Sequence, residues 1–427
     1  MIEQLFQQLR GKRILIAGFG REGKSSLNFI KNQLPDVEVA VADRNSNCII
    51  ELTKIDPNIS FFGGEQYLQQ ANNFDLILKS PGIKLDVSLL ERVQISSQTD
   101  LFLSAYNAQI IGITGTKGKS TTATLIHHIL VNSELPALLT GNMGIPCFDI
   151  ISQITPKSIV VFELSAHQLQ FVRHSPRVCV LLNIFEEHLD HFGDMESYRN
   201  AKLNLIRFAG KADFAVLHHA LRQFVYGLQA SISYFPEANI FELPLALRGD
   251  HNRLNIEAAL MATACFGVSK KNGLSALTTF QSLPHRLEYL GQKGGVHFYN
   301  DSIATIPEAV IAALEAIPQT NFLILGGFDR GISYQSLASF LLEKPVDRIF
   351  FVGKAGRRMA EMLQKQNYSG QLVPIENLQQ VFVALKDIAK PGNTCLLSPA
   401  AASYDQFENF EQRGKMYKEL AEEFGGK

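Results

Sequence analysis

Short apolar runs that end in glycine or in Ser-Pro recur along the chain, and segments with helical spacing separate them. In the first hundred residues the apolar runs cover residues 13–20, 37–44 and 74–83, and residues 21–34 place their apolar side chains at helical spacing. Strands that alternate with helices in this way indicate a parallel sheet flanked by helices.

The same pattern begins again near residue 98 and a third time near residue 284. The segments that carry it are residues 108–130 (strand, glycine loop, helix), 158–169 and 177–185 (strands), 251–266 (helix), and 283–290, 321–328, 348–353 and 394–400 (the third start and three more strands). We therefore predict an α/β protein of three αβ domains. They are a Rossmann-like N-terminal domain (1–97), a central P-loop ATPase-like domain with a mostly parallel sheet (98–283) and a Rossmann-like C-terminal domain (284–427).

Composition and charge exclude several classes of partner. The 427 residues carry a formal net charge of −1, which gives no electrostatic footprint for nucleic acid or an anionic membrane. The five cysteines are dispersed and lack zinc-ligand spacing, so we expect free thiols in a reducing compartment. The N-terminus lacks the apolar region of a signal peptide, and no apolar run is long enough to span a membrane. We expect a cytoplasmic monomer.

The stretch GFGREG, residues 18–23, is a glycine fingerprint between the first strand and the first helix. Gly18, Gly20 and Gly23 would allow a tight turn and let a pyrophosphate approach the helix N-terminus. Asp43, at the end of the next strand, could accept a hydrogen bond from a ribose hydroxyl. The pattern favours a nucleotide-like ligand over a bare αβ turn, and it does not say which nucleotide.

A second glycine motif, GITGTKGKSTT at residues 112–122, follows a strand and opens a helix, which is the context of a phosphate-binding loop. Five residues separate Gly112 from Gly118, whereas the familiar loop has four. We expect backbone N–H groups to cradle phosphates, Lys119 to reach the terminal phosphates, and the Ser120 hydroxyl to ligate Mg²⁺.

Oxygen and imidazole groups lie at the ends of the next two strands. Glu163 and His188 each follow an apolar run, and beside a phosphate loop they could complete the coordination of Mg²⁺. Four neighbours of His188 fit the spacing equally well: Glu186, Glu187, Asp190 and His191. Residue type alone places Lys202, in the helical YRNAKLNLI, on a solvated surface.

Further sequence blocks turn these separate motifs into one resemblance. The blocks are GNMGIP from Gly141, ELSAHQL from Glu163, EEHLDHFGDMESYRNAKL from Glu186, HNRLN from His251, LPHRLE from Leu283, NDSIAT from Asn300 and LLSPAAASYDQFENFEQRG from Leu396. With a phosphate loop of the form G-x-x-G-T-x-G-K-[ST], they resemble the Mur ligase family from one end of the chain to the other. The last block is similar to that of the glutamate-adding members.

The resemblance implies a reaction and its cofactors. ATP would phosphorylate the terminal carboxylate of UDP-N-acetylmuramoyl-L-alanine, and the amine of glutamate would attack the resulting acyl phosphate, releasing ADP and phosphate. The cofactors would be ATP and two Mg²⁺ ions. The N-terminal domain would bind the UDP substrate, the central domain ATP, and the C-terminal domain would close on ATP and the incoming amino acid.

The resemblance also assigns residues to these roles. For ATP they are Gly115, Thr116, Lys117, Gly118, Lys119, Ser120, Thr121, Asn252, Asn255, Arg286 and Asp301. For the UDP substrate they are Gly18, Phe19, Gly20, Asp43, Arg44, Ser80, Pro81, Gly82 and Asn142. For the amino acid they are Thr305, Arg330, Ser403, Tyr404 and Phe410. The catalytic residues would be Lys119, Glu163, His188 and Lys202, and the metal ligands Ser120, Glu163, His188 and Lys202 as a carbamate.

The amino-acid pocket departs from the family pattern. Ile303 stands where the family has lysine, Ile306 where it has asparagine, and Tyr404 where it has leucine. The second pocket lysine aligns with Arg330, which keeps a cation and could bind a carboxylate bidentately. We therefore expect the incoming amino acid to be D-glutamate, and the alternative is L-glutamate or another acidic residue.

Three other functions compete with this interpretation. A folylpolyglutamate-synthase-like ligase would share the phosphate loop, but GFGREG and FEQRG disfavour it. A dinucleotide-dependent oxidoreductase would use GFGREG and leave Lys119, Glu163 and His188 without a purpose. An ATP-binding regulator would bind ATP without turnover.

Overall fold

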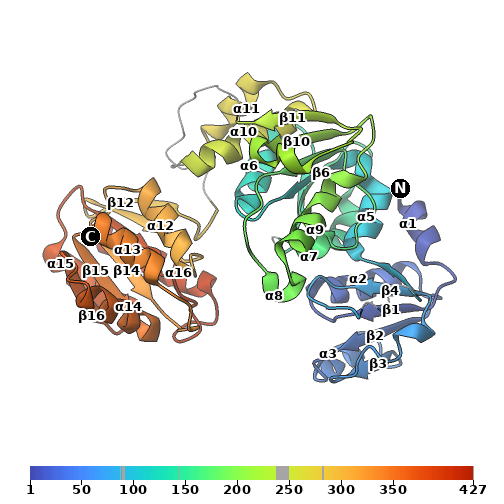
Figure 1. Cartoon of the computed structure of the whole chain (residues 1–427), viewed down its shortest axis with the longest axis horizontal. Helices are drawn as coiled ribbons and strands as arrows, with labels where there is room; N and C mark the ends of the chain where they lie inside the picture. Colours follow the sequence, from blue (N-terminus) through green and yellow to red (C-terminus); the bar gives the residue numbers. More distant parts are fainter. Residues whose placement is uncertain (87, 89–91, 143, 237–249, 281–282, 427) are drawn as a thin grey trace. The chain divides into compact units, whose positions relative to one another are not determined.

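The computed structural model describes residues 1–427 except 87, 89–91, 143, 237–249, 281–282 and 427 (Figure 1). The described residues form two compact units. One unit lies within Met1–Phe241 and Leu254–Thr278, and the other within Glu242–Arg253 and Thr279–Lys427.

The first sheet, near the N-terminus, has five parallel strands in the order β3-β2-β1-β4-β5 (Figure 1). Its strands are β1 (Ile14–Ala17), β2 (Val39–Asp43), β3 (Ser60–Gly63), β4 (Leu76–Lys79) and β5 (Gln94–Ser96). Its helices are α1 (Ile2–Leu9), α2 (Arg21–Gln33), α3 (Cys48–Ile55) and the 3₁₀ turn η1 (Ala71–Asn73). Because β1 pairs with β4, the glycine turn after β1 and the Ser80–Gly82 turn after β4 lie side by side.

The second sheet belongs to the same unit and has six parallel strands in the order β11-β10-β9-β6-β8-β7. Its strands are β6 (Ile110–Thr114), β7 (Ala137–Gly141), β8 (Ile159–Glu163), β9 (Val178–Leu181), β10 (Phe214–His218) and β11 (Ser231–Phe235). The helices from residue 98 to residue 277 are α5 (Gln98–Tyr106), η2 (Asn107–Gln109), α6 (Lys119–Asn132), η3 (Cys147–Gln153), α7 (Ala166–Leu169), α8 (Leu189–Phe192), α9 (Met195–Arg207), η4 (His219–Phe224), α10 (Asp250–Ala264) and α11 (Lys270–Leu277). Since β6 lies between β8 and β9, the carboxyl ends of these three strands bring their loops to one edge.

The third sheet forms the second unit and has six strands in the order β12-β13-β17-β14-β15-β16. All its pairs are parallel except the antiparallel pair of β12 and β13. Its strands are β12 (Glu288–Lys293), β13 (Val296–Asn300), β14 (Phe322–Gly326), β15 (Arg348–Val352), β16 (Gln371–Ile375) and β17 (Thr394–Leu397). Its helices are α12 (Pro307–Ala316), α13 (Gln335–Glu343), α14 (Gly353–Lys365), α15 (Leu378–Ile388) and α16 (Phe410–Gly425).

Helices cover both faces of the third sheet, and each face has its own apolar core. Leu323 and Leu325 of β14 belong to one core, whereas Phe322 and Ile324 belong to the other. Successive side chains of a strand point to opposite faces, so the continuous apolar run at 321–328 is that of a strand buried on both sides.

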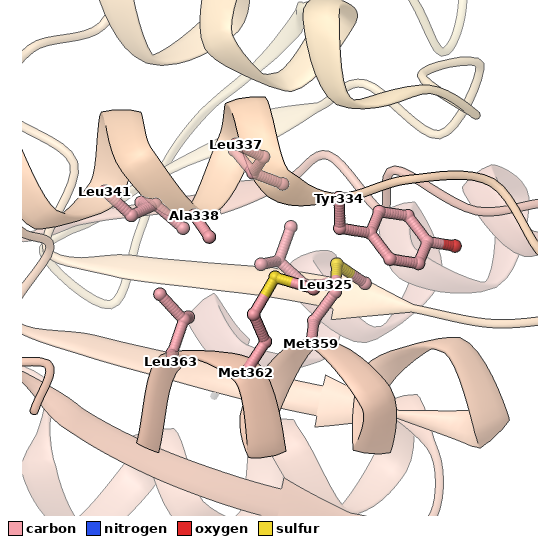
Figure 2. A pocket seen from close by; sticks show the side chains of 8 residues that line it. All are labelled: Leu325, Tyr334, Leu337, Ala338, Leu341, Met359, Met362 and Leu363. Atoms are coloured by element: carbon pink, nitrogen blue, oxygen red, sulfur yellow. The ribbon is translucent and has the colours of Figure 1, made fainter. Parts of the chain in front are cut away.

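A small apolar cavity lies between α13, α14 and β14 (Figure 2). Its lining consists of Leu325, Tyr334, Leu337, Ala338, Leu341, Met359, Met362 and Leu363. A volume of about 10 Å³ is at the lower limit for a single water molecule. Because none of these lining residues is among those assigned to ligands, we regard the cavity as a packing defect of the core.

The structure confirms the predicted α/β class with three mostly parallel sheets, and each sheet falls within one of the three predicted domain ranges. The domain boundaries stay predictions. The five cysteines are free thiols, as expected. Among the described residues, no helix has the length and apolar character needed to cross a membrane.

Candidate active site

The first glycine turn is packed too closely for a side chain at Gly18 or at Gly23. Gly18 has a φ of +94°, and its carbonyl accepts a hydrogen bond of 2.8 Å from the hydroxyl of Ser80. A Cβ atom on Gly23 would lie 2.0 Å from that same carbonyl oxygen. Helix α2 begins directly after this turn, and no side chain caps its N-terminus at Gly20. The turn therefore offers helix N–H groups to an anion.

Asp43 fixes the shape of this turn from the neighbouring strand. Its two carboxylate oxygens accept hydrogen bonds from the backbone N–H groups of Phe19 (2.6 Å) and Asn45 (2.8 Å). Arg44 next to it forms an exposed ion pair of 2.7 Å with Glu65. The assignment of Asp43 and Arg44 to the UDP substrate stays a prediction.

The second glycine loop is held by the chain that follows β9. The N–H groups of Thr116 and Lys117 donate to the backbone and side-chain oxygens of Asn183, at 2.9 and 2.8 Å. Gly118 precedes α6 with a φ of +86°, and a Cβ there would lie 2.4 Å from Asn255 Oδ1. The structure thus places Asn255 against the phosphate loop, and its predicted adenine contact stays untested.

Two lysines converge on one carbonyl oxygen of this loop. Lys119 Nζ and Lys202 Nζ donate to the oxygen of Gly115 at 2.9 and 2.8 Å. Lys202 comes from α9, is 1% exposed, and places its Nζ over the Tyr198 ring, 4.8 Å from the ring centroid. Burial first, and the charge of Lys119 second, lower the pKa of Lys202 to about 6. The expectation from residue type, that Lys202 is a solvated surface charge, is wrong.

Glu163 ends β8 beside the same loop and is 1% exposed. One carboxylate oxygen accepts a 2.9 Å hydrogen bond from Asn142 Nδ2. The other oxygen, and the hydroxyl of Thr114 at the end of β6, are buried without a hydrogen-bond partner among the described residues. Orphaned hard oxygens of this kind are what Mg²⁺ takes as ligands, so the residues present fit a magnesium site.

The segment with His188 lies next to the phosphate loop, and Glu187 contacts the loop directly. Glu187 Oε1 pairs with Lys117 at 2.8 Å and Oε2 lies 3.7 Å from His188. Burial raises the pKa of Glu187, but the hydrogen bond from Lys117 and the neighbouring cations outweigh it, and the net shift is downward. The rings of His188 and His191 both contact that of His167. The geometry does not choose among these groups as metal ligand, and within the described part of the chain no cluster of three or more His, Cys, Asp or Glu is arranged to hold a metal ion.

Sequence reasoning missed a polar link between helices α2 and α7. Gln168 of α7 donates a 2.6 Å hydrogen bond to Glu22, in the first turn of α2. Burial raises the pKa of Glu22 to about 7, and burial lowers the pKa of Lys79 to about 8. Lys79 Nζ donates to the carbonyl oxygen of Pro81 at 2.9 Å and so braces the Ser80–Gly82 turn. The sequence signals were a charged residue in GFGREG (Glu22) and a lysine directly before the Ser80–Gly82 turn (Lys79).

Asp301 lies in the second unit and is buried in its interior. Its carboxylate accepts hydrogen bonds from Ser398 Oγ at 2.8 Å and from the N–H of Leu287 at 3.1 Å. Burial raises its pKa to about 7. Asp301 thus joins β13, β17 and the turn that carries Arg286, and the ATP contacts predicted for Arg286, Asp301 and Asn252 stay predictions.

Three loops of the second unit carry the residues assigned to the amino acid. Arg413 of α16, 3% exposed, donates to Ser302 Oγ, the Ser302 carbonyl and the Ala401 carbonyl at 3.0, 2.7 and 3.0 Å. It therefore joins the loop of Thr305 to the loop of Ser403 and Tyr404. Arg330 lies on the third loop. The residues assigned to the amino acid are placed as follows: Thr305 accepts from Arg330 through its carbonyl, Ser403 is buried, Tyr404 is 69% exposed, and Phe410 begins α16.

Family models match all three parts of the chain. Residues 12–98 match "Mur ligase MurD-like, N-terminal domain", residues 113–225 match "Mur ligase middle domain", and residues 285–401 match "Mur ligase, glutamate ligase domain".

Curated relatives match over nearly the whole length. The UDP-N-acetylmuramoylalanine–D-glutamate ligase of Natranaerobius thermophilus is 30% identical, with 97% of this chain and 98% of the relative covered. The protein of the same name from Symbiobacterium thermophilum is also 30% identical, with 96% and 98% covered.

Solved structures share the fold. The MurF ligase of Acinetobacter baumannii superposes with a TM-score of 0.63 at 17% identity, covering 98% of each chain. The MurF ligase of Thermotoga maritima in complex with ADP gives 0.61 at 17% identity, covering 99% of this chain and 100% of that one. The chain belongs to the Mur ligase family, whose members are ATP-dependent, and it is a ligase.

Proposed function

We propose that this ligase joins D-glutamate to UDP-N-acetylmuramoyl-L-alanine through an acyl phosphate, releasing ADP and phosphate, in the synthesis of peptidoglycan precursors. One observation carries the chemistry: the phosphate loop, Lys119, Lys202 and Glu163 meet at the carboxyl edge of the second sheet. The names of the curated relatives supply the substrates.

The phosphate loop would bind ATP and stabilise the transferring phosphoryl group. The N–H groups at the start of α6 and the ammonium of Lys119 are a local positive site in a protein of net charge −1. As the substrate carboxylate attacks the γ-phosphorus, negative charge spreads over the phosphoryl oxygens, and fixed donors stabilise it without reorganising.

Mg²⁺, when bound, would neutralise charge on the phosphates and orient them. Glu163, with its unpartnered oxygen, and Ser120 would hold one ion, and His188 with Lys202 as a carbamate would complete a second site. Asn142 donates a hydrogen bond to Glu163 Oε1 and so fixes the orientation of the carboxylate whose Oε2 would bind the ion.

Lys202 has the environment that carbamylation requires. Only a neutral amine adds to CO₂, and burial leaves this amine neutral near pH 7. Near pH 7 Lys119 therefore shares the Gly115 carbonyl with a neutral amine, whereas a carbamate at Lys202 would be an anion that attracts Lys119.

The two turns at the ends of β1 and β4 would hold the UDP part of the substrate. The uncapped start of α2 would receive the pyrophosphate. Asp43 and Ser80 keep the turn in the shape that lets a phosphate approach the backbone.

Arg330 would bind a carboxylate of the incoming amino acid. It lies on an exposed loop and uses one guanidinium nitrogen to hold the Thr305 carbonyl at 2.7 Å. The remaining donors form a fork that fits a carboxylate. Ile303 gives no cation, so one arginine rather than two lysines would choose the substrate. With this difference in the pocket, L-glutamate stays the second candidate.

Phosphate release tests the proposal. The wild-type chain is incubated with ATP, Mg²⁺, UDP-N-acetylmuramoyl-L-alanine and either enantiomer of glutamate, and each component is omitted in turn. The proposal expects release that needs every component and is faster with D-glutamate. Faster phosphate release with L-glutamate would show that L-glutamate, and not D-glutamate, is the incoming amino acid. Phosphate release without the UDP substrate would overturn the proposal. Size-exclusion chromatography of the same sample tests the predicted monomer.

A further inference from the structure

One arginine of helix α14 holds the loop of Arg330 on both sides. Arg358 Nη2 forms an ion pair of 3.1 Å with Asp329, the residue before Arg330. The same nitrogen donates to the carbonyl of Ile332, two residues after Arg330. A single guanidinium thus fixes both flanks of the residue assigned to the carboxylate.

The rest of this loop is also ordered by hydrogen bonds. Asp329 accepts a 2.9 Å hydrogen bond from the N–H of Gly331, which adopts a φ of +75°. Arg358 itself is held by packing its guanidinium over the Tyr334 ring at 4.6 Å. Asp329 is 10% exposed, so its charge is largely removed from water and depends on Arg358 as its partner.

The contacts that Arg358 makes with Asp329 and Ile332 matter because Arg330 lies exposed on this loop. A long cationic side chain on a mobile loop must be ordered when it binds a carboxylate, and that ordering weakens binding. Where the loop is fixed and the guanidinium already hydrogen-bonds the Thr305 carbonyl, most of the ordering has occurred before the ligand arrives.

We propose that Arg358 is a positioning residue that, with Asp329, holds Arg330 in place for the incoming acidic amino acid. The inference rests on the proposed function, because it takes Arg330 as the group that binds the glutamate carboxylate. Arg358 acts through Arg330 and is not assigned a contact with the substrate.

The test compares three variants by steady-state kinetics with the enantiomer that the wild-type chain uses. Arg358→Met removes the ion pair and keeps the length of the side chain. Arg358→Lys keeps a cation for Asp329 but loses the planar fork. Arg357→Met is the matched control, because Arg357 is the exposed neighbour on the same helix.

We expect Arg358→Met to raise the KM for glutamate about tenfold, with the KM values for ATP and the UDP substrate within about twofold of wild type. Arg358→Lys should recover part of the loss, and Arg357→Met should match wild type. An unchanged KM for glutamate in Arg358→Met, or a parallel rise of all three KM values, would overturn the inference.

A fourth variant covers the case in which Arg358→Met does not fold. Asp329→Asn removes the other half of the pair and should raise the KM for glutamate in the same selective way. Where both variants fold, the double variant should be no worse than the poorer single variant, since both remove one interaction. If wild type itself releases no phosphate in response to glutamate, both the proposed function and the inference that rests on it are refuted. If wild type is active and the variants leave the KM for glutamate unchanged, only the inference fails.

Discussion

Replacing Lys202 by methionine should make the protein more stable while it abolishes activity. Lys202 is an amine buried at 1% exposure with a pKa of about 6, against 10.5 for an exposed lysine. Methionine fills a similar volume and has no charge to lose. The side chain that the chemistry needs is therefore one that destabilises the fold.

The size of the effect follows from the pKa. Keeping a lysine of pKa 10.5 neutral at pH 7 costs about 5 kcal/mol (3.5 pH units at about 1.4 kcal/mol each). The variant loses the hydrogen bond from Lys202 to the Gly115 carbonyl, which is worth about 1 kcal/mol. We expect Lys202→Met to gain about 3 kcal/mol at pH 7, allowing for relaxation around the site.

The gain should depend on pH in a known direction. The folded pKa lies below the unfolded one, so between pH 6 and 10.5 the unfolded chain binds the extra proton and wild-type stability rises with pH. The advantage of Lys202→Met should therefore shrink by about 3 kcal/mol from pH 6.5 to pH 8.5. Below pH 6 both states hold the proton, and the difference should level off.

Urea unfolding in CO₂-depleted buffer at pH 6.5, 7.5 and 8.5 measures the difference in stability between Lys202→Met and wild type. Lys211→Met is the control, because Lys211 is exposed. Added bicarbonate should stabilise wild type and leave Lys202→Met unchanged. In kinetics, Lys202→Ala should be inactive and regain activity with a short carboxylate. A stability gain of Lys202→Met that does not change with pH would refute the claim that Lys202 is a buried neutral amine. A variant less stable than wild type at pH 6.5 would refute it as well. Failure of rescue would count against the carbamate.

Three further changes, the first with a matched control, test other parts of the structure. Gly23→Ala would press a methyl group against the Gly18 carbonyl 2.0 Å away, so we expect a loss of about 1–3 kcal/mol in thermal unfolding and a raised KM for the UDP substrate. Gly20→Ala, where nothing lies within 4 Å, should leave the unfolding midpoint unchanged, and equal losses would contradict the packing argument. Glu163→Gln should lower kcat about 100-fold and raise the Mg²⁺ concentration for half-maximal rate, and an unaltered Mg²⁺ titration would remove it as a ligand. Arg413→Met should destabilise the second unit by about 3 kcal/mol, because it removes three buried hydrogen bonds made by a charged group. A free energy of unfolding equal to that of wild type would contradict this prediction.

Sequence patterns located the sheet edges because the strands end in recognisable residues. Glu163 directly follows an apolar run in the sequence, and in the structure it is the last residue of β8. The phosphate loop was expected between a strand and a helix, and it joins β6 to α6. Parallel strands send their carboxyl ends to one edge, so these local signals were enough to bring the motifs together.

Contacts between segments far apart in sequence could not be predicted in the same way. Lys202 and its apolar neighbours gave no sign that its Nζ is buried against Gly115, 87 residues earlier. Arg413 joins two loops that lie 111 and 12 residues away, and only the fold brings them together. Arg358 has the sequence context of an ordinary helix-surface arginine, and its role depends on a loop from another part of the sheet. Helical spacing fixes a face, and tertiary packing decides what that face meets.

The transfer of oxygen from substrate to phosphate tests the central claim most directly. UDP-N-acetylmuramoyl-L-alanine labelled with ¹⁸O in both carboxylate oxygens is incubated with ATP, Mg²⁺, D-glutamate and the wild-type chain, and the released phosphate is analysed by mass spectrometry. Attack of the carboxylate on ATP and later loss of phosphate from the acyl phosphate place one ¹⁸O atom in each phosphate. We predict that singly labelled phosphate forms in step with the D-glutamyl product. Unlabelled phosphate, or labelled phosphate formed only with L-glutamate, would contradict the account.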